Sequence, residues 1–279
     1  MVSKASWKSE VEGGERFEFG ANWADFLTHL SPERIEAAEQ SLKRLLGSDR
    51  LDGKTFLDIG SGSGLFSLAA RRLGARVTSF DYDPQSVACT SELKRRFFDG
   101  DPDWAIVEGS VLDEAFLESL GTFDIVYSWG VLHHSGELWK ALKAAAGKVS
   151  PGGTFAFALY EKTPLCGAWR VEKRLYARAG PFGQRLIRWP YTLAYQAARF
   201  ASGRGIKSSN LERGMKIGHD IHDWLGGFPY ESTNREEVAE HLRPLGLEPV
   251  LEQRVTVHLA GLFGTGCSEY VYRRVATSP

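Results

Sequence analysis

Long apolar stretches and cysteines are scarce in this 279-residue sequence. No stretch reaches the about eighteen consecutive apolar residues that indicate a membrane-spanning helix. Residues 1–14 are polar and charged and lack the apolar core of a secretory signal peptide. The three cysteines, Cys89, Cys166 and Cys267, are too few and too far apart for a disulfide framework or a cysteine-rich metal site. We therefore expect a cytoplasmic protein that neither spans a membrane nor depends on disulfides.

Acidic residues are nearly absent from one segment. The chain has a net charge of −1, yet residues 162–216 contain twelve Lys or Arg and two acids, so this segment carries +10 and the remainder −11. The segment also contains seven large aromatic residues, namely Trp169, Tyr176, Phe182, Trp189, Tyr191, Tyr195 and Phe200. At 43% hydrophobic and 25% charged residues, the whole chain has the composition of a globular protein with a real core. We expect the basic, aromatic segment to be a distinct insertion.

From residue 55 the sequence alternates between strand-like and helix-like patterns. The predicted strands are 55–59, 76–80, 105–107, 123–128 and 153–159, and the helices between them are 65–73, 84–98, 114–120 and 137–149. A helix with Ser31 as N-cap and Gly47 at its end precedes them, and residues 150–153 read as a turn into the fifth strand. After Tyr160 the alternation stops, and it resumes with a helix at 234–242 and strands at 248–257 and 269–275. The alternation predicts an α/β fold with a parallel sheet and helices on both faces.

The first predicted strand runs into a turn with glycines at alternate positions, Gly60, Gly62 and Gly64. Glycine there removes the Cβ atoms where the backbone must approach a ligand. The third glycine of the dinucleotide pattern G-x-G-x-x-G would fall at Leu65, so that pattern fails. The second strand-like run ends in Asp81, and an acid at this distance can accept hydrogen bonds from both hydroxyls of an adenosine ribose.

Together, the turn and the acid resemble motif I and the acidic loop of the class I S-adenosylmethionine-dependent methyltransferases. The resemblance implies a Rossmann-like seven-stranded sheet with helices on both faces, the last strand antiparallel between the fifth and sixth, and a helical insertion after strand five. We expect an N-terminal helical cap at 1–50, the methyltransferase domain at 51–162 and 230–279, and the basic aromatic insertion or lid at 163–229.

The resemblance also implies a set of cofactor-binding residues. Asp58 helps to hold the methionine end of S-adenosylmethionine through water, and Asp81 accepts from the ribose. After strand three, Ser110 stands where many members carry an acid for the adenine amino group, so Ser110, the Val111 backbone and apolar contact are the alternatives for adenine recognition. The remaining predicted contacts are the turn residues Gly60, Ser61, Gly62 and Gly64, Tyr82 over the adenine, and Trp129 at the end of strand four.

Two nucleic-acid methyltransferase signatures are missing. The Asn/Asp-Pro-Pro-aromatic motif of amino-methylating enzymes is absent, because no Pro-Pro occurs in the chain, and lone cysteines do not resemble the paired motifs of RNA cytosine-C5 enzymes. Instead, strand four is followed by the Leu-His-His sequence of residues 132–134, which resembles the ubiquinone-biosynthesis-type small-molecule methyltransferases. We expect a small-molecule acceptor, anionic or lipophilic, and no DNA; an RNA or protein methyltransferase and a non-catalytic cofactor-binding protein are the alternatives.

Four histidines are candidates for a general base. His133 and His134 follow strand four, while His219 and His222 lie in a stretch, 218–230, that reads as a loop. We favour His134 and His222, with a rate that rises through an apparent pKa of about 6–7, and place Tyr160 at the end of strand five as the next candidate. His219 and His222 could bind a metal with a neighbouring aspartate, but methyl transfer needs none, and we expect no metal.

The basic segment allows several interpretations. Its arginines could hold an anionic substrate as a lid, its helices could lie on anionic lipid beside a lipophilic substrate, or it could be a solvated basic face. Interleaved basic and aromatic residues could also bind RNA. The sequence does not indicate an oligomeric state.

Overall fold

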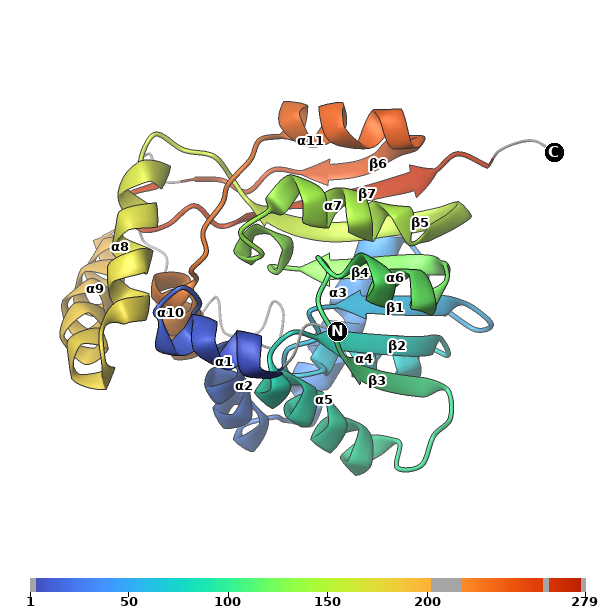
Figure 1. The fold of residues 1–279 in the computed structure, drawn as a ribbon, viewed down its shortest axis with the longest axis horizontal. Coiled ribbons are helices and arrows are strands. Elements are labelled where there is room, and N and C mark those ends of the chain that lie inside the picture. The colour runs from blue at the N-terminus through green and yellow to red at the C-terminus, as the bar shows by residue number, and fades with distance from the viewer. Residues whose placement is uncertain (1–3, 202–216, 258–260, 277–279) are drawn as a thin grey trace.

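A seven-stranded sheet forms the centre of the molecule (Figure 1). The computed structural model describes residues 4–201, 217–257 and 261–276. The strand order of the sheet is β3-β2-β1-β4-β5-β7-β6. The strands are β1 (Thr55–Ile59), β2 (Arg76–Asp81), β3 (Trp104–Glu108), β4 (Phe123–Trp129), β5 (Val149–Tyr160), β6 (Leu247–Gln253) and β7 (Cys267–Arg274). Strands β1 to β5 pair in parallel, and β7 pairs antiparallel with both β5 and β6. The predicted fold class and the place of the last strand are confirmed.

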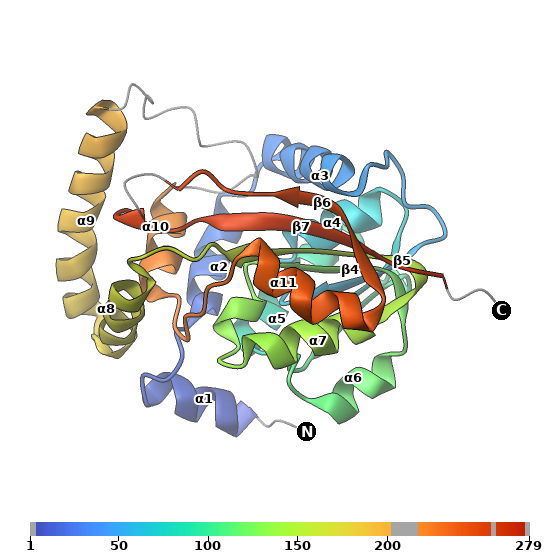
Figure 2. The same cartoon turned by 90° about the horizontal axis from the view of Figure 1, so that it is seen from above.

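Helices cover both faces of the sheet (Figure 2). The helices are α1 (Lys4–Glu12), α2 (Phe19–Thr28), α3 (Pro32–Leu46), α4 (Leu65–Arg72), α5 (Pro84–Phe97), α6 (Glu114–Leu120), α7 (Leu138–Gly147), α8 (Cys166–Arg178), α9 (Pro181–Ala201), α10 (Ile217–Gly226) and α11 (Arg235–Leu242), with short 3-10 turns at Leu132–His134 and Arg243–Leu245. Side chains of β1 alternate between two cores, with Phe56 in one and Leu57 and Ile59 in the other.

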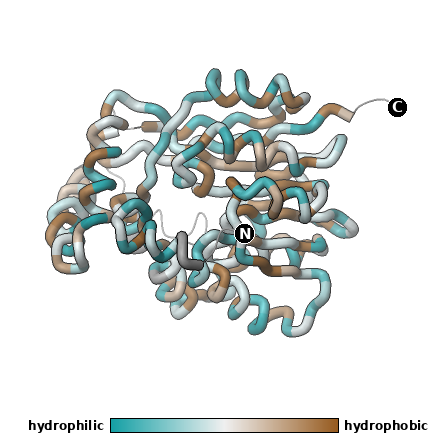
Figure 3. The backbone as a smooth tube through the Cα atoms, viewed as in Figure 1, coloured by the Kyte–Doolittle hydropathy of each residue, from teal (hydrophilic) through white to brown (hydrophobic). Residues whose placement is uncertain are grey.

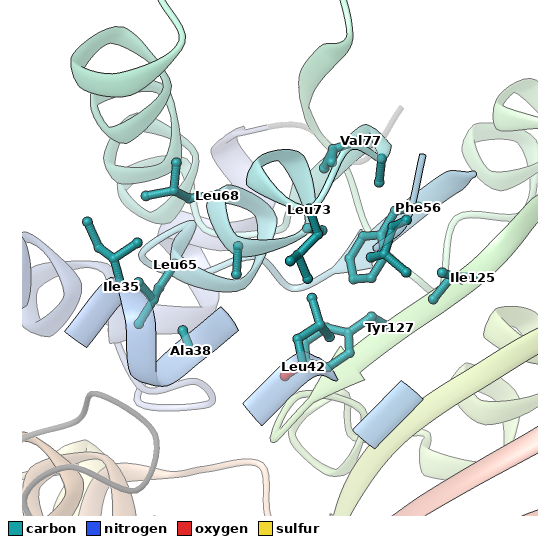
Figure 4. Close-up of a cluster of buried hydrophobic side chains, with 14 of the residues drawn as sticks. Ile35, Ala38, Leu42, Phe56, Leu65, Leu68, Leu73, Val77, Ile125 and Tyr127 are labelled. Carbon is teal, nitrogen blue, oxygen red and sulfur yellow. The ribbon is translucent and has the colours of Figure 1, made fainter. Parts of the chain in front are cut away.

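The first core lies under α3 and α4 (Figure 4). Ile35, Ala38 and Leu42 of α3 point at Leu65 and Leu68 of α4 and at the sheet beyond. The second core lies under α6, α7 and α11. Most residues of the central strands β1 and β4 are buried, and most of the buried ones are hydrophobic. The apolar residues that recur along 32–46 therefore form the buried side of α3, which packs on the same core as the sheet.

The predicted turn at 150–153 is wrong, because these residues belong to β5. Val149 pairs with Phe123, and the next regular pair joins Thr154 to Ile125. Four residues of β5 therefore stand opposite one residue of β4, which makes a large bulge, and Gly152 supplies its positive φ of 74°. The Pro-Gly-Gly signal correctly marked an interruption, but strand pairing continues on both sides of it.

The predicted loop at 218–230 is also only partly correct, because most of it forms α10. Ile221 and Leu225, one helical turn apart, are buried against Phe17 and Tyr176 in a third core. Apolar residues recur at helical spacing here, at Ile217, Ile221, Trp224 and Leu225, so the sequence did contain a periodic signal that our prediction of a loop missed.

The insertion forms the helix pair α8 and α9 at the end of the molecule opposite the C-terminus (Figures 1 and 2). Its later part, residues 202–216, lies outside the described residues. Trp169 and Tyr176 of α8 and Tyr191 and Tyr195 of α9 belong to the third core or pack against it. None of the described helices combines the length and the apolar character that crossing a membrane requires.

Replacement of Gly64 should destabilise the fold more than replacement of Gly100. Gly64 precedes α4 with φ +81°, and a Cβ there would lie 2.9 Å from Thr90 Cα. Gly100 has φ +70°, with no described atom within 4 Å of an added Cβ. We expect Gly64→Ala to lower the free energy of unfolding by about 2–4 kcal/mol and Gly100→Ala by about 1 kcal/mol. Denaturant unfolding measures both; equal losses would contradict the close contact at Gly64.

Candidate active site

A cavity of about 590 Å³ opens at the carboxyl ends of the parallel strands. It lies where the strand order reverses between β1 and β4, which is the place where open α/β sheets bind ligands. Its wall combines the turn after β1, the ends of β2 to β5, the N-terminal segment and α10. Nine of the ten predicted cofactor-binding residues line this wall: Asp58, Gly60, Ser61, Gly62, Asp81, Tyr82, Ser110, Val111 and Trp129.

The turn after β1 can exist only with glycine at two positions on this wall. Gly60 and Gly62 have φ of +75° and +54°. A Cβ on Gly60 would lie 2.4 Å from Val131 Cγ1, and one on Gly62 would lie 3.0 Å from Trp23 Nε1. Gly64, the tenth predicted residue, is absent from the described cavity wall and instead fits α4 against Thr90. The structure thus places the first two glycines beside the cavity and the third behind it.

Asp81 presents a fixed carboxylate to the cavity. Its Oδ2 accepts from the Gly62 amide at 2.9 Å, and its Oδ1 accepts from the Asp83 amide at 2.9 Å. The helix cap at α5 is supplied by Asp83, whose side chain accepts from Gln85 N. Burial raises the pKa of Asp81 to about 6, against the opposing effect of the two amide hydrogen bonds. Asp81 is therefore held in place by the glycine turn and is available to accept further hydrogen bonds.

Asp58 lies at the base of the cavity and is almost fully buried. Ser67 Oγ donates to its Oδ2 at 2.5 Å, and Ser67 in turn lies 2.7 Å from Ser79 Oγ. Burial raises the pKa of Asp58 to about 7, with a smaller contribution from the nearby Asp81 carboxylate. Two carboxyl groups of raised pKa on one cavity wall are suited to a ligand that carries hydroxyl groups and a positive charge.

The N-terminal segment forms part of the cavity, which we did not predict. Trp7, Phe17, Phe19 and Trp23 line it, together with Arg16. The density of aromatic residues between positions 7 and 26 is the signal that could have indicated this role.

Polar contacts fix this segment against the cofactor side of the cavity. Arg16 Nη1 donates to the His134 carbonyl at 3.1 Å, and its guanidinium lies 4.9 Å from the centre of the Tyr82 ring. Tyr82 OH donates to Glu10 Oε1 at 2.9 Å, and Arg16 Nε donates to Glu10 Oε2 at 2.7 Å. The α1 helix is thus connected directly to the predicted adenine-covering residue.

Two predicted catalytic residues, His134 and Tyr160, line the cavity together. Their ring centroids are 5.3 Å apart. His134 Nδ1 lies 2.8 Å from the Pro229 carbonyl, which assigns the proton to Nδ1 and leaves Nε2 as the accepting nitrogen. Burial lowers the pKa of His134 to about 3, so the ring is neutral at physiological pH. This value lies below the apparent pKa of about 6–7 that the sequence analysis expects for a histidine base.

Neither His133 nor His222 belongs to the described cavity wall. His133 is completely buried against Tyr160, and burial lowers its pKa. His222 Nδ1 lies 2.8 Å from Tyr176 OH, and its ring packs edge-on against Phe17. His219 lies in α10, but its side chain is outside the described part of the chain. Where side chains are described, no three His, Cys, Asp or Glu gather to hold a metal.

The α10 helix contributes Asp223 and Trp224 to the cavity wall instead. Asn22 Nδ2 donates to Asp223 Oδ1 at 2.7 Å and so joins α2 to α10. Behind Trp224, the fully buried Lys173 places its ammonium 3.6 Å from the indole ring centre and 5.3 Å from that of Tyr230. Burial lowers the pKa of Lys173 to about 7, while the neighbouring Glu172 acts in the opposite direction.

Comparison with known proteins agrees with this geometry. Residues 29–219, more than half of the chain, match the family described as methyltransferase domain. Ubiquinone biosynthesis O-methyltransferase from Xanthomonas campestris pv. campestris (strain B100) is 32% identical over 134 residues, which cover 48% of this chain and 54% of that protein. The protein of the same name from Xanthomonas euvesicatoria pv. vesicatoria is 30% identical over 155 residues, 55% of this chain and 60% of the relative. The chain thus matches little more than half the length of these curated relatives.

Solved structures share the fold at low sequence identity. Magnesium protoporphyrin IX methyltransferase from Synechocystis with bound S-adenosylhomocysteine is 12% identical, with a TM-score of 0.53 over 87% of this chain and 84% of that one. Its structure with S-adenosylmethionine is 11% identical, with a TM-score of 0.52 over 87% and 80%. The sequence match and the fold lead to the same conclusion: the chain belongs to the methyltransferase domain family, with the class I S-adenosylmethionine-dependent fold.

Proposed function

We propose that this chain transfers the methyl group of S-adenosylmethionine to a small, largely apolar acceptor. The observation that carries the proposal is that one cavity contains the glycine turn after β1, the Asp81 carboxylate and an aromatic chamber. The aromatic chamber is the part of the cavity lined by Phe17, Phe19, Trp23, Tyr160 and Trp224. The residues fit the cofactor, because the Gly62 amide of the turn holds the Asp81 carboxylate in place and Asp81 has acceptor capacity beyond its two amide contacts. Asp58 would neutralise the ammonium end.

The cofactor supplies an activated methyl group on its sulfonium, so this chain has mainly to align the acceptor. Trp224 and Tyr160 would form the wall against which a flat apolar acceptor lies, beyond the cofactor residues. His134, neutral and with Nε2 free of the proton, would orient an acceptor hydroxyl and take its proton as the bond to carbon forms. Phe17, Phe19 and Trp23 would exclude water. An oxygen acceptor is supported by the name O-methyltransferase of the relatives.

A cytoplasmic location belongs to the same proposal. No disulfide joins Cys89, Cys166 and Cys267 in the structure, which suits a reducing compartment. The domain assignment of the sequence analysis also stays a proposal, with the addition that residues 1–50 contribute to the cavity rather than only covering it.

Methyl transfer from tritium-labelled S-adenosylmethionine tests the proposal. We expect label in apolar phenols and little in bulk RNA or protein offered at the same mass concentration. Label that enters only RNA or protein would favour a macromolecular acceptor. Cofactor binding without transfer to any acceptor class would favour a cofactor-binding protein without catalysis.

A further inference from the structure

The outward side of the α8–α9 helix pair carries large apolar side chains that contact no core. Phe182 is 82% exposed, Trp189 69% and Phe200 80%. Leu186 and Leu193 are also exposed, and so are Val171 and Leu175 on α8. Hydrophobic positions recur along this helix pair in Figure 3. Seven exposed large apolar residues on two consecutive helices are far more than scattered surface residues require.

These residues form a continuous stripe. At about 100° per residue, positions 182, 186, 189, 193 and 200 fall on one side of α9. Ile187, Tyr191 and Tyr195, which pack against the third core, fall on the opposite side. The α9 helix is thus apolar on two opposite faces, and the described residues of the chain cover only one of them. We call the uncovered one, with Val171 and Leu175, the outer apolar face.

Arginines border the outer apolar face. Arg174 and Arg178 lie beside Val171 and Leu175 on α8, and Arg185 lies beside Leu186 on α9; all three are exposed. Residues 162–201 contain eight Lys or Arg and one acid. A stripe of Phe, Trp and Leu edged with arginine is the composition of helices that lie in the headgroup region of an anionic bilayer.

We propose that the outer apolar face docks on an anionic membrane surface. A second copy of this chain fits poorly, because a symmetric dimer through this face would oppose the same arginines. RNA would pair with the arginines but would leave the aliphatic side chains of the stripe without an apolar partner. A bilayer satisfies both features at once. Docking does not require the proposed methyl transfer, since it uses no residue of the cavity.

The opposite side of the same helix pair faces the acceptor end of the cavity. Trp169, on the core side of α8, is 5.2 Å from Trp224 between ring centroids, and Trp224 lines the cavity. Docking through the outer apolar face would therefore leave the cavity wall uncovered.

Sedimentation of the full chain with vesicles tests the proposal. We expect at least tenfold more protein bound to vesicles with about 30 mol% phosphatidylglycerol than to pure phosphatidylcholine, and a loss of binding as salt rises. Leu186→Glu with Trp189→Glu should reduce binding at least tenfold, and Arg174→Gln with Arg178→Gln should weaken it severalfold and flatten the salt dependence. Val250→Glu, at a 61% exposed residue of β6, is the matched control and should bind as the parent does.

The proposal is overturned if the parent does not sediment with anionic vesicles or if the Leu186/Trp189 variant binds as well as Val250→Glu. It is also overturned if Trp189→Glu abolishes a dimer seen by light scattering in the absence of lipid. Circular dichroism and unchanged affinity for S-adenosylhomocysteine establish that each variant is folded. Loss of methyl transfer with intact vesicle binding would count against the proposed function alone.

Discussion

Asp81→Asn should weaken the binding of S-adenosylmethionine by about 1.5–3 kcal/mol, or roughly 10- to 150-fold. The substitution keeps the shape of the side chain, but its single oxygen can accept from only one of the amides of Gly62 and Asp83, which bond different oxygens of Asp81. What it removes is the negative charge and an oxygen that can accept from the ribose hydroxyls. Isothermal titration of parent and variant measures the loss.

Asp113→Asn is a matched control for this substitution. Asp113 is the N-cap of α6, accepts from the Phe116 amide and does not belong to the described cavity wall. Asparagine caps helices about as well as aspartate, so both folding and affinity should be preserved. Equal losses in the two variants would show that the effect at Asp81 is not specific to the site.

The affinity of the parent for the cofactor should also fall as the pH is lowered below about 6. The bound ribose requires the ionised form of Asp81, and burial places the pKa of this group at about 6. Below that pH the ionised fraction, and with it the affinity, should drop by up to about tenfold per unit. Asp58, with a pKa of about 7, contributes to the same loss of affinity at low pH. The affinity of the Asp81→Asn variant should therefore depend on pH less steeply than that of the parent, but the dependence should not vanish. A constant affinity from pH 8 to pH 5 would contradict these assignments.

His134→Gln should lower turnover by about 100-fold and leave cofactor affinity within about threefold. His134 lines the cavity, and its Nδ1 donates to the Pro229 carbonyl, while the predicted cofactor residues lie on other segments. Because burial keeps the pKa of His134 at about 3, the parent rate should show no limb between pH 5 and 8 from this group. Orientation of the acceptor is therefore expected to contribute more than basicity.

His222→Gln is the control for that experiment. His222 bonds Tyr176 in the third core and does not line the described cavity wall, so turnover should stay within about threefold of the parent. If His134→Gln keeps more than about a tenth of parental turnover, His134 is not the group that orients and deprotonates the acceptor. A large loss in Tyr160→Phe would then move the role to Tyr160.

The sheet and the cofactor side of the site could be predicted because their signals are local. Residues 55–59 form a short apolar run, the glycines follow at once, and Asp81 ends the next run, so that strand, turn and acid are all read within a few residues. The predicted and observed bounds of β1 and α6 coincide. The topology of β7 came from the family resemblance and not from the pattern, because nothing in the sequence of β7 encodes its neighbours.

The acceptor side could not be predicted because it is made by contacts between distant segments. Arg16 reaches His134, Asn22 reaches Asp223, and Trp169 meets Trp224. Whether a histidine faces the cavity or a core depends on helix rotation and on its partners, and for this reason His133 and His134 have different surroundings although they are adjacent. The hydrogen bond between Tyr176 and His222 likewise depends on how α8 packs against α10.

A crystal structure of the chain with S-adenosylhomocysteine tests the central claim most directly. We predict the ligand in the described cavity, with its ribose hydroxyls within hydrogen-bond distance of the Asp81 carboxylate and its amino-acid end toward Asp58. The adenine should lie near Tyr82 and Ser110. Ligand bound elsewhere, or a ribose that makes no contact with Asp81, would contradict the claim that this cavity is the cofactor site of a methyltransferase.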